Sequence, residues 1–392
     1  EEPDLSNQTY VENGFGKGLM KMTAENGTID GGFTLALQHT LLGLQLKGSD
    51  ALSKIVLTNP ADSKTYTLTC TDVTLTEDAS TLFYIVVPKG NWPSGFRVDV
   101  YAEDNSTILN TFEKTGNVSF DGSAVAMPEQ DVNIKSFTAN GVSFRMIAVK
   151  KGTFTMGATQ MQEDFQDDLD ITHSNYDKPA HQVTLTYDYH IGETEVTQEL
   201  WEAVMGTNPS RLNGVGYEQH PVDSVNWDNC QAFVTELNNL LADQLNGKTF
   251  RLPTNAEWEY AARGGHKMDY EYIFAGSDIA AEVAWYSRYK QDLTYSQPVK
   301  GKNPNELGLY DMSGNVEEWC HDPYYTYTTD PKTYPNDYIS EDNGYHVVRG
   351  GRWWIKKGDG SRFCRVGYRN NYQYETRHDF LGLRLALVEE NE

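Results

Sequence analysis

The chain has 392 residues, of which 39% are apolar and 12% aromatic, so it is long and apolar enough for more than one globular domain. Its formal net charge of −24 opposes long-range attraction to nucleic acid or to an anionic membrane. We therefore expect no nucleic-acid partner and attribute the acidity to solubility. No apolar run is long enough for a membrane-spanning helix.

The chain begins Glu1-Glu2-Pro3 without a methionine or a signal segment, which is typical of a mature or truncated protein whose export signal has been removed. Four cysteines lack metal-ligand spacing: Cys70, Cys230, Cys320 and Cys364. Single cysteines of this kind are usually small buried hydrophobes, although one pair could form a disulfide in an oxidising compartment. The scattered histidines likewise give no reason to expect a catalytic metal.

Residues 1–134 have the pattern of short strands separated by turns. The apolar or alternating segments are rich in Val, Thr and Tyr and lie at 41–46, 54–57, 65–68 and 83–87. Their even spacing predicts an all-β sandwich. No cluster of titratable residues indicates chemistry here, so we expect an assembly or anchoring module.

Three motifs of this region are similar to a known family: His39-Thr40-Leu41-Leu42-Gly43-Leu44, the turn at 85–90 before 96–98, and the closing segment 122–128. The region resembles the fimbrillin-like domains of Bacteroidales surface proteins. The resemblance implies pilus or envelope assembly partners that bind through residues 1–134.

Residues 129–140 are typical of a linker, and the second domain is expected to cover residues 135–392. Two short strands joined by a turn are predicted at 144–149 and 152–157. The acidic segment at 162–170 is interpreted as a solvated loop that ends near Asp177. A calcium-binding loop is the alternative, but the carboxylates lack the spacing and the turn glycine of an EF-hand.

Helices are predicted at 197–205 and 228–241, and a third follows Thr254. In the second of these, Cys230, Phe233 and Leu237 form one apolar stripe, which either Leu240 or Leu241 continues. Thr254 and Glu257 have the spacing of a capping box, and the glycines at 264–265 allow the helix to end there.

A series of motifs occurs in order along the second domain: Gly152-Thr153-Phe154-Thr155-Met156-Gly157, then 193–197, 221–227, 251–265, 308–319, Arg349-Gly350-Gly351 and Gly382-Leu383-Arg384. The series resembles the formylglycine-generating enzyme (sulfatase-modifying factor) family. The resemblance implies a C-type-lectin-like fold of mixed α/β (α+β) character with little regular structure.

The enzymes of that family hold copper with two cysteine thiolates, and cuprous ion prefers sulfur. The resemblance places the two positions at about Ile355 and near Gly360 or Ser361, and none of these is cysteine. Cys364 supplies only one thiol nearby. The iron-dependent branch of the fold needs a His-x₃-His-x-Glu arrangement, which the chain lacks. We therefore do not expect formylglycine generation, and an enzyme with an altered site remains the alternative.

No cofactor is required by this interpretation, but the resemblance implies a possible structural calcium ion. Asn315 and Glu318, in and after the Gly314-Asn315-Val316 turn, offer the oxygen ligands that calcium prefers. The alternative is a tight turn whose polar groups bond to neighbouring backbone. The upstream calcium-binding stretch departs from the family, because the segment at 283–285 lacks the usual asparagine.

The segment from Arg349 to Leu385 has nine basic residues against three acidic ones, together with seven aromatics. Arginine and aromatic side chains supply much of the energy of interfaces. Part of the segment is expected in the core, namely Trp353, Cys364, Val366, Leu381, Leu383 and Leu385. The candidate ligand-binding residues are Arg352, Trp354, Lys356, Lys357, Arg362, Tyr368, Asn370, Tyr372, Tyr374, Glu375, His378 and Asp379.

This segment also resembles the variable segment of diversity-generating-retroelement target proteins, in which a fixed frame such as Arg-Gly-Gly, Cys-Arg-Val and Gly-x-Arg-Leu surrounds diversified positions. Asn370 and Asn371 would be template-like positions. We therefore predict an exported binding protein of the outer membrane or cell surface, whose ligand is a protein surface or an acidic glycan. A lipid anchor is one way in which it could be attached there. A structural component of a pilus or envelope is a further alternative.

Overall fold

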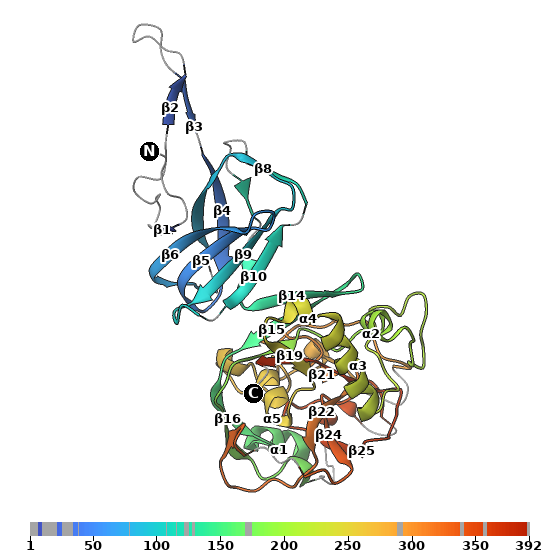
Figure 1. The fold of residues 1–392 in the computed structure, drawn as a ribbon. Coiled ribbons are helices and arrows are strands. Elements are labelled where there is room, and N and C mark those ends of the chain that lie inside the picture. Colours follow the sequence, from blue (N-terminus) through green and yellow to red (C-terminus); the bar gives the residue numbers. More distant parts are fainter. Residues whose placement is uncertain are drawn as a thin grey trace. The chain divides into compact units, whose positions relative to one another are not determined.

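A computed structural model describes residues 7–9, 22–25, 34–37, 39–77, 79–106, 108–114, 116–120, 125–127, 130–168, 175–287, 293–337, 341–355 and 359–389. The chain divides into two compact units, Glu1–Lys135 and Ser136–Glu392, which we describe separately (Figure 1). The linker predicted at 129–140 is wrong in one respect, because strands occupy Gln130–Asp131 and Ile134–Ala139.

The described elements of the first unit are all strands. One sheet has the order β1-β6-β5-β9-β10, and in another β4 pairs with β7, β12 and β13. The pairs β2–β3 and β8–β11 are separate. The strands are β1 (Asn7–Thr9), β2 (Met22–Glu25), β3 (Thr34–Leu37), β4 (His39–Lys47), β5 (Ala51–Asn59), β6 (Lys64–Thr74), β7 (Thr81–Pro88), β8 (Gly90–Trp92), β9 (Phe96–Ala102), β10 (Ile108–Lys114), β11 (Val118–Phe120), β12 (Val125–Ala126) and β13 (Gln130–Asp131).

The strands predicted at 41–46, 54–57, 65–68 and 83–87 lie within β4, β5, β6 and β7, so these four predictions are confirmed. Buried side chains alternate with partly exposed ones in β5 from Ile55 to Asn59, because successive strand residues face opposite sides of a sheet. Ile55 and Leu57 of β5 are fully buried in one core with Phe83 and Val98.

The second unit contains four groups of strands in its described residues, with the orders β14-β15-β18-β27-β19, β25-β24-β22-β26, β16-β17-β23 and β20-β21. Its strands are β14 (Ile134–Ala139), β15 (Val142–Val149), β16 (Gly152–Met156), β17 (His181–Leu185), β18 (Tyr189–Gly192), β19 (Lys248–Arg251), β20 (Ala284–Trp285), β21 (Ser313–Gly314), β22 (Glu317–Pro323), β23 (Lys332–Tyr334), β24 (Tyr345–Arg349), β25 (Asn370–Gln373), β26 (Leu381–Leu383) and β27 (Ala386–Glu389).

Six α-helices accompany these sheets among the described residues: α1 (Gln160–Asp168), α2 (Gln198–Met205), α3 (Trp227–Leu240), α4 (Ala242–Leu245), α5 (Asn255–Ala262) and α6 (Ala280–Val283). Short 3₁₀ turns lie at Asn175–Asp177, Gly265–Lys267 and Gly360–Phe363. Within the described part of the chain, no helix is long and apolar enough to cross a membrane.

The predicted helices form where their capping residues allow them to begin. The Thr197 side chain accepts a hydrogen bond from the Leu200 amide at the start of α2. Thr254 and Glu257 form the predicted capping box of α5, with N–H···O distances of 3.1 and 2.8 Å. These helix predictions are confirmed. The apolar stripe of α3 is continued by Leu241, which is buried, whereas Leu240 is exposed.

Two local predictions differ from the structure. The acidic segment interpreted as a loop begins as helix α1, which runs from Gln160 to Asp168 and directs Gln162 into the interior. The strands β15 and β16 exist, but they belong to different sheets, because β15 pairs with β18 and β16 with β17. The many charged residues of α1 suggested that solvent surrounds the segment, so the buried side of the helix was not predicted.

All four cysteines are free and buried, so the disulfide alternative is not realised and the expectation of buried hydrophobes is confirmed. Aromatic side chains pack against aliphatic ones in the core of the second unit. Trp201 of α2 stacks on Phe233 of α3 with ring centroids 4.8 Å apart and an interplanar angle of 5°. Burial of large apolar side chains such as these contributes about 1.5–3 kcal/mol each, so this contact helps to hold α2 against α3.

Candidate ligand-binding face

The frame of the C-terminal segment begins at the end of β24, where Gly350 and Gly351 turn the chain. Both glycines have left-handed φ angles, 89° and 75°. A Cβ atom on Gly351 would lie 2.4 Å from the carbonyl oxygen of Phe363. These glycines therefore serve a turn, and the turn brings residues 352–354 against the chain around Phe363.

Replacing Gly351 by alanine is expected to destabilise the second unit by about 2–4 kcal/mol, because a left-handed φ and a backbone clash both oppose a side chain. Gly344→Ala is the matched control. Gly344 has a similar φ of 80°, but a Cβ atom added there would meet no described atom within 4 Å, so only the backbone cost of about 1–2 kcal/mol applies. Urea denaturation followed by tryptophan fluorescence measures the loss of unfolding free energy in both variants. Equal losses in the two variants would contradict the close contact at Gly351.

Four rings of the segment lie in a series that we call the aromatic row: Trp354, Phe380, His378 and Tyr372. Trp354 stacks on Phe380 with centroids 6.4 Å apart and an interplanar angle of 18°. His378 stacks on Phe380 at 4.7 Å and 19°, and Tyr372 meets His378 edge-on at 5.4 Å. Phe380 is buried and the other three rings are partly exposed. The row therefore presents ring edges and faces at the surface.

Arg352 joins the aromatic row to the sheet behind it. Its Nη1 donates to the Glu317 carboxylate and to the Tyr372 hydroxyl, each at 2.9 Å, and its Nε donates to the Trp354 carbonyl at 3.0 Å. The guanidinium also lies over the Phe380 ring, 4.4 Å from its centroid. Because these contacts fix Arg352 from several sides, it positions the row and is not free to reach a ligand.

The predicted ligand-binding residues separate into groups by exposure. Tyr374 and Glu375 are exposed, while Trp354, Arg362, Asn370, Tyr372, His378 and Asp379 are partly exposed. Tyr368 is buried and meets Phe363 edge-on at 5.2 Å, so its assignment as a ligand contact is wrong. Lys356 and Lys357 lie outside the described residues. The six predicted core residues Trp353, Cys364, Val366, Leu381, Leu383 and Leu385 are all buried, as expected.

Part of the positive charge of this segment lies inside the protein. Arg365 donates to the Asp177 carboxylate at 2.8 Å, and Arg384 is paired with Glu318 at 2.8 Å. Four arginines of the segment are among the largest fully buried side chains: Arg349, Arg365, Arg369 and Arg384. These four arginines therefore give no argument for an acidic glycan, because their side chains are buried.

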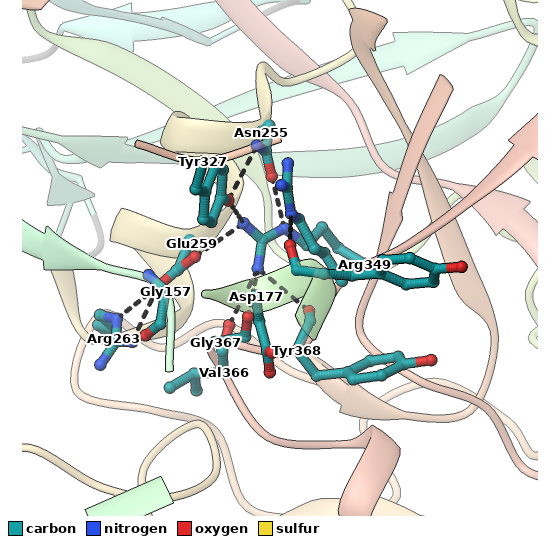
Figure 2. Close-up of polar contacts among 12 residues, drawn as sticks. Gly157, Asp177, Asn255, Glu259, Arg263, Tyr327, Arg349, Val366, Gly367 and Tyr368 are labelled. Atoms are coloured by element: carbon teal, nitrogen blue, oxygen red, sulfur yellow. Dashed lines mark hydrogen bonds and ion pairs between the residues drawn. The ribbon is translucent and has the colours of Figure 1, made fainter. Parts of the chain in front are cut away.

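Arg349 shows how such an arginine supports the frame (Figure 2). Its guanidinium donates to the Glu259 carboxylate at 2.7 Å, the Asn255 side-chain carbonyl at 2.7 Å and the Tyr327 hydroxyl at 2.9 Å. Another nitrogen donates to the Tyr368 carbonyl at 3.1 Å. Helix α5, the loop after β22 and the segment at 366–368 are thereby tied to the end of β24.

The residues proposed for calcium do not fit that ion. Arg384 Nε and Nη2 donate to both carboxylate oxygens of Glu318 at 2.8–3.1 Å, and Trp258 also donates to Glu318. The Asn315 amide donates to Glu195, and its carbonyl oxygen accepts from the Gln297 amide. A cation at Glu318 would have to displace a fully buried guanidinium. The described residues contain no group of three or more His, Cys, Asp or Glu side chains suited to a metal.

The positions of the copper thiolates hold side chains that cannot bind copper. Ile355 is buried in apolar surroundings, and Gly360 and Ser361 are buried in a short 3₁₀ turn. Cys364 is the cysteine of this region, and burial raises the pKa of its thiol, so it is protonated at neutral pH. A single protonated thiol does not form the two-sulfur site.

Asp322 is a fully buried acid beside the start of α5, where its carboxylate accepts from the Asn255 amide at 2.6 Å. Burial, followed by the repulsion from Glu257, raises its pKa to about 7. Because the folded pKa exceeds the unfolded one, the proton stabilises the fold fully below about pH 4, and this stabilisation is lost as the pH rises through about 7.

Asp322→Asn is therefore expected to flatten the pH dependence of stability. Relative to the variant, the wild type should lose on the order of 3 kcal/mol of unfolding free energy between pH 4 and pH 8. Urea denaturation of both proteins at several pH values measures this difference, and other buried acids cancel in the comparison. Parallel curves for the two proteins would contradict a raised pKa at Asp322.

Sequence reasoning missed three residues that shape the face. Glu317 anchors Arg352, Phe380 forms the middle of the aromatic row, and Arg211 forms an ion pair with Asp379 from a loop of another segment. Phe380 follows directly after the predicted contact Asp379 and could have been included. No local signal pairs Arg211 with Asp379, because 168 residues separate them.

These features define a mixed α+β unit with a C-type-lectin-like fold. Buried arginine–carboxylate pairs support its aromatic surface, and no cysteine lies at the positions expected for the copper thiolates. The model of the sulfatase-modifying factor enzyme 1-like domain matches residues 130–388. The chain therefore belongs to this family, as the sequence motifs predicted.

Individual relatives carry different names. The chain is 33% identical over 216 residues to chaperone protein LppX of Paenibacillus barcinonensis, which covers 44% of this chain and 71% of that protein. It is 31% identical to the formylglycine-generating enzyme of Streptomyces coelicolor over 47% of this chain and 60% of the enzyme. Among solved structures, Treponema denticola variable protein 1 matches with a TM-score of 0.54 and 32% identity, over 65% of this chain and 99% of that one.

Proposed function

We propose that the chain is a cell-surface binding protein whose ligand contacts the aromatic row and the neighbouring exposed residue Tyr374. One observation carries the proposal: apolar and small residues replace the copper thiolates, while rigidly held aromatic side chains cover the surface of the same segment. Aromatic side chains give a large contact area at a low cost in conformational entropy. The similarity to a variable protein and to a chaperone supports binding in preference to catalysis.

The charged residues that the structure describes around the row are mostly balanced, which favours a ligand without strong net charge. Arg352 is neutralised by Glu317 and Asp379 by Arg211, and the exposed Glu375 and Arg377 have opposite signs. A protein surface fits this arrangement better than an acidic glycan. The first unit, as a fimbrillin-like β-sandwich, would anchor or assemble the protein at the outer membrane or cell surface, where a lipid anchor is also proposed.

The test is a binding screen of the full chain against arrays of glycans and of extracellular protein domains. Trp354→Ala and Tyr374→Ala are expected to weaken any ligand of the face by at least tenfold, or about 1.4 kcal/mol. Tyr270→Ala is the matched control, because Tyr270 is an aromatic residue of similar exposure, 47% against 38% for Tyr374, outside this segment. Ligands that respond equally to all three substitutions, or to none, would contradict the proposal.

The alternative is an oxidoreductase of the formylglycine-generating kind with an altered site, which membership of the family favours. Copper titration of the full chain, with mass spectrometry of a cysteine-containing substrate peptide, distinguishes the two. Stoichiometric Cu(I) binding together with conversion of the peptide cysteine would establish the enzyme and overturn the binding proposal.

A further inference from the structure

Strand β25 forms an edge of the four-stranded sheet of the second unit, with β24 as its neighbour in the order β25-β24-β22-β26 (Figure 1). It runs from Asn370 to Gln373 and thus lies inside the candidate ligand-binding face. An edge strand presents unpaired N–H and C=O groups that can pair with another chain. The register of β25 shows which groups these are.

The Tyr374 amide donates to the Gly344 carbonyl at 3.1 Å, which makes these opposite residues a hydrogen-bonded pair. Hydrogen-bonded and non-hydrogen-bonded pairs alternate along an antiparallel ladder. Asn371 therefore forms a non-hydrogen-bonded pair with Val347, and Gln373 forms another with Tyr345. The main-chain N–H and C=O groups of Asn371 and Gln373 are directed away from β24.

One of these outward groups is already used, because the Gln373 carbonyl accepts from the Thr376 amide at 2.9 Å. The N–H and C=O of Asn371 and the N–H of Gln373 form no hydrogen bond with another described residue. Asn371 is partly exposed and Gln373 is exposed. A donor, an acceptor and a second donor thus lie along one open edge.

Apart from its length of four residues, the edge lacks the usual protection of exposed strands. Charged residues, proline and bulges commonly block such edges, but β25 reads Asn-Asn-Tyr-Gln and pairs with β24 without a register shift. Strand β10 of the first unit differs, because Lys135 donates to the Leu109 carbonyl at 2.7 Å and the ladder shifts register near Asn110. Protection is thus present at one sheet edge of the chain and missing at β25.

We propose that β25 binds an extended segment of a protein partner, which adds to the sheet as a further strand beside Asn371 and Gln373. This inference rests on the proposed function and specifies its ligand class. Side chains alternate between the two faces of a strand, and Tyr372 lies against the aromatic row whereas Gln373 donates to the exposed Tyr345 hydroxyl at 3.2 Å. Main-chain pairing supplies affinity, and tyrosines on both sides select an uncharged segment with apolar residues at alternate positions.

The test uses the full chain and linear dodecapeptides selected from a phage-displayed random library. Asn371→Pro removes the outward N–H without breaking the ladder to β24, since that N–H does not face β24. Asn371→Ala removes only the side chain. The selected peptide is expected to bind Asn371→Pro at least tenfold more weakly, and Asn371→Ala within about threefold of the wild type.

A scan of the peptide by single N-methylations tests the same inference without changing the protein. N-methylation at alternate positions is expected to abolish binding, because every second N–H of an added strand faces the edge. Three results would overturn the inference. The peptide could tolerate every N-methylation, it could bind Asn371→Pro and the wild type equally, or the library could yield no peptide for this face. Dimerisation of the chain that Asn371→Pro abolishes would also overturn it, by showing a second copy at the edge.

The two proposals fail in different ways. Suppose that a glycan or a folded domain binds only when Trp354 is present, binds Asn371→Pro normally and displaces no peptide. This result would leave the proposed binding function intact and refute strand addition. Ligands that are insensitive to Trp354→Ala, Tyr374→Ala and Asn371→Pro alike would refute both.

Discussion

Replacing Arg384 by methionine is expected to destabilise the second unit by about 3–5 kcal/mol, the range for breaking a buried ion pair from one side. Arg384 is fully buried and donates to both oxygens of Glu318. Two further buried acids lie nearby. Burial raises the pKa of Glu195, and it raises that of Asp311 to about 6. Without the guanidinium, Glu318 would lose its buried ion-pair partner while these two acids still repel its charge.

Urea denaturation followed by tryptophan fluorescence measures this loss, since most of the tryptophans belong to the second unit. Arg145→Met is the control: Arg145 pairs with Glu193 at 3.0 Å, but its side chain is 43% exposed. An exposed pair contributes about 0–1 kcal/mol. Equal losses for the two variants would show that the buried pair has no special role. If Arg384→Met does not fold, Arg384→Lys, which keeps the charge, is expected to fold with a smaller loss.

Local sequence signals predicted the elements well, because the interactions that cause them are local. Thr254 and Glu257 are three residues apart, so the capping box of α5 can be read directly from the chain. The strands β4 and β5 follow equally from alternation and turn residues. The family motifs then gave the fold of the second unit, as the matched family model confirms.

The burial of charge could not be predicted in this way. Arg365 pairs with Asp177 across 188 residues, and Arg384 pairs with Glu318 across 66. A single chain gives no indication of such partners, so the count of nine basic residues could not separate buried charge from surface charge. This had a consequence for function, because the count suggested an acidic ligand. The structure instead places four of the segment's nine basic residues inside the protein, where they support the frame of the aromatic row.

Arg352→Met is expected to have the second large effect, on stability and binding together. Glu317, which is 1% exposed, would keep the Tyr372 hydroxyl as a partner but lose the guanidinium. The expected loss is about 3 kcal/mol, the low end for a broken buried pair, because Arg352 itself reaches solvent in part. Arg352 also holds the Trp354 carbonyl, so the aromatic row should lose its fixed geometry.

The double variant Arg352→Met/Glu317→Leu separates the two effects. Replacing both members of a buried pair by apolar groups is often nearly neutral for stability, so the double variant should regain most of the unfolding free energy. It does not restore the hydrogen bonds to Tyr372 and Trp354. Binding of a ligand that needs Trp354 should therefore remain at least tenfold weaker in the double variant. Full recovery of binding with stability would mean that Arg352 supports only the fold and does not position the face.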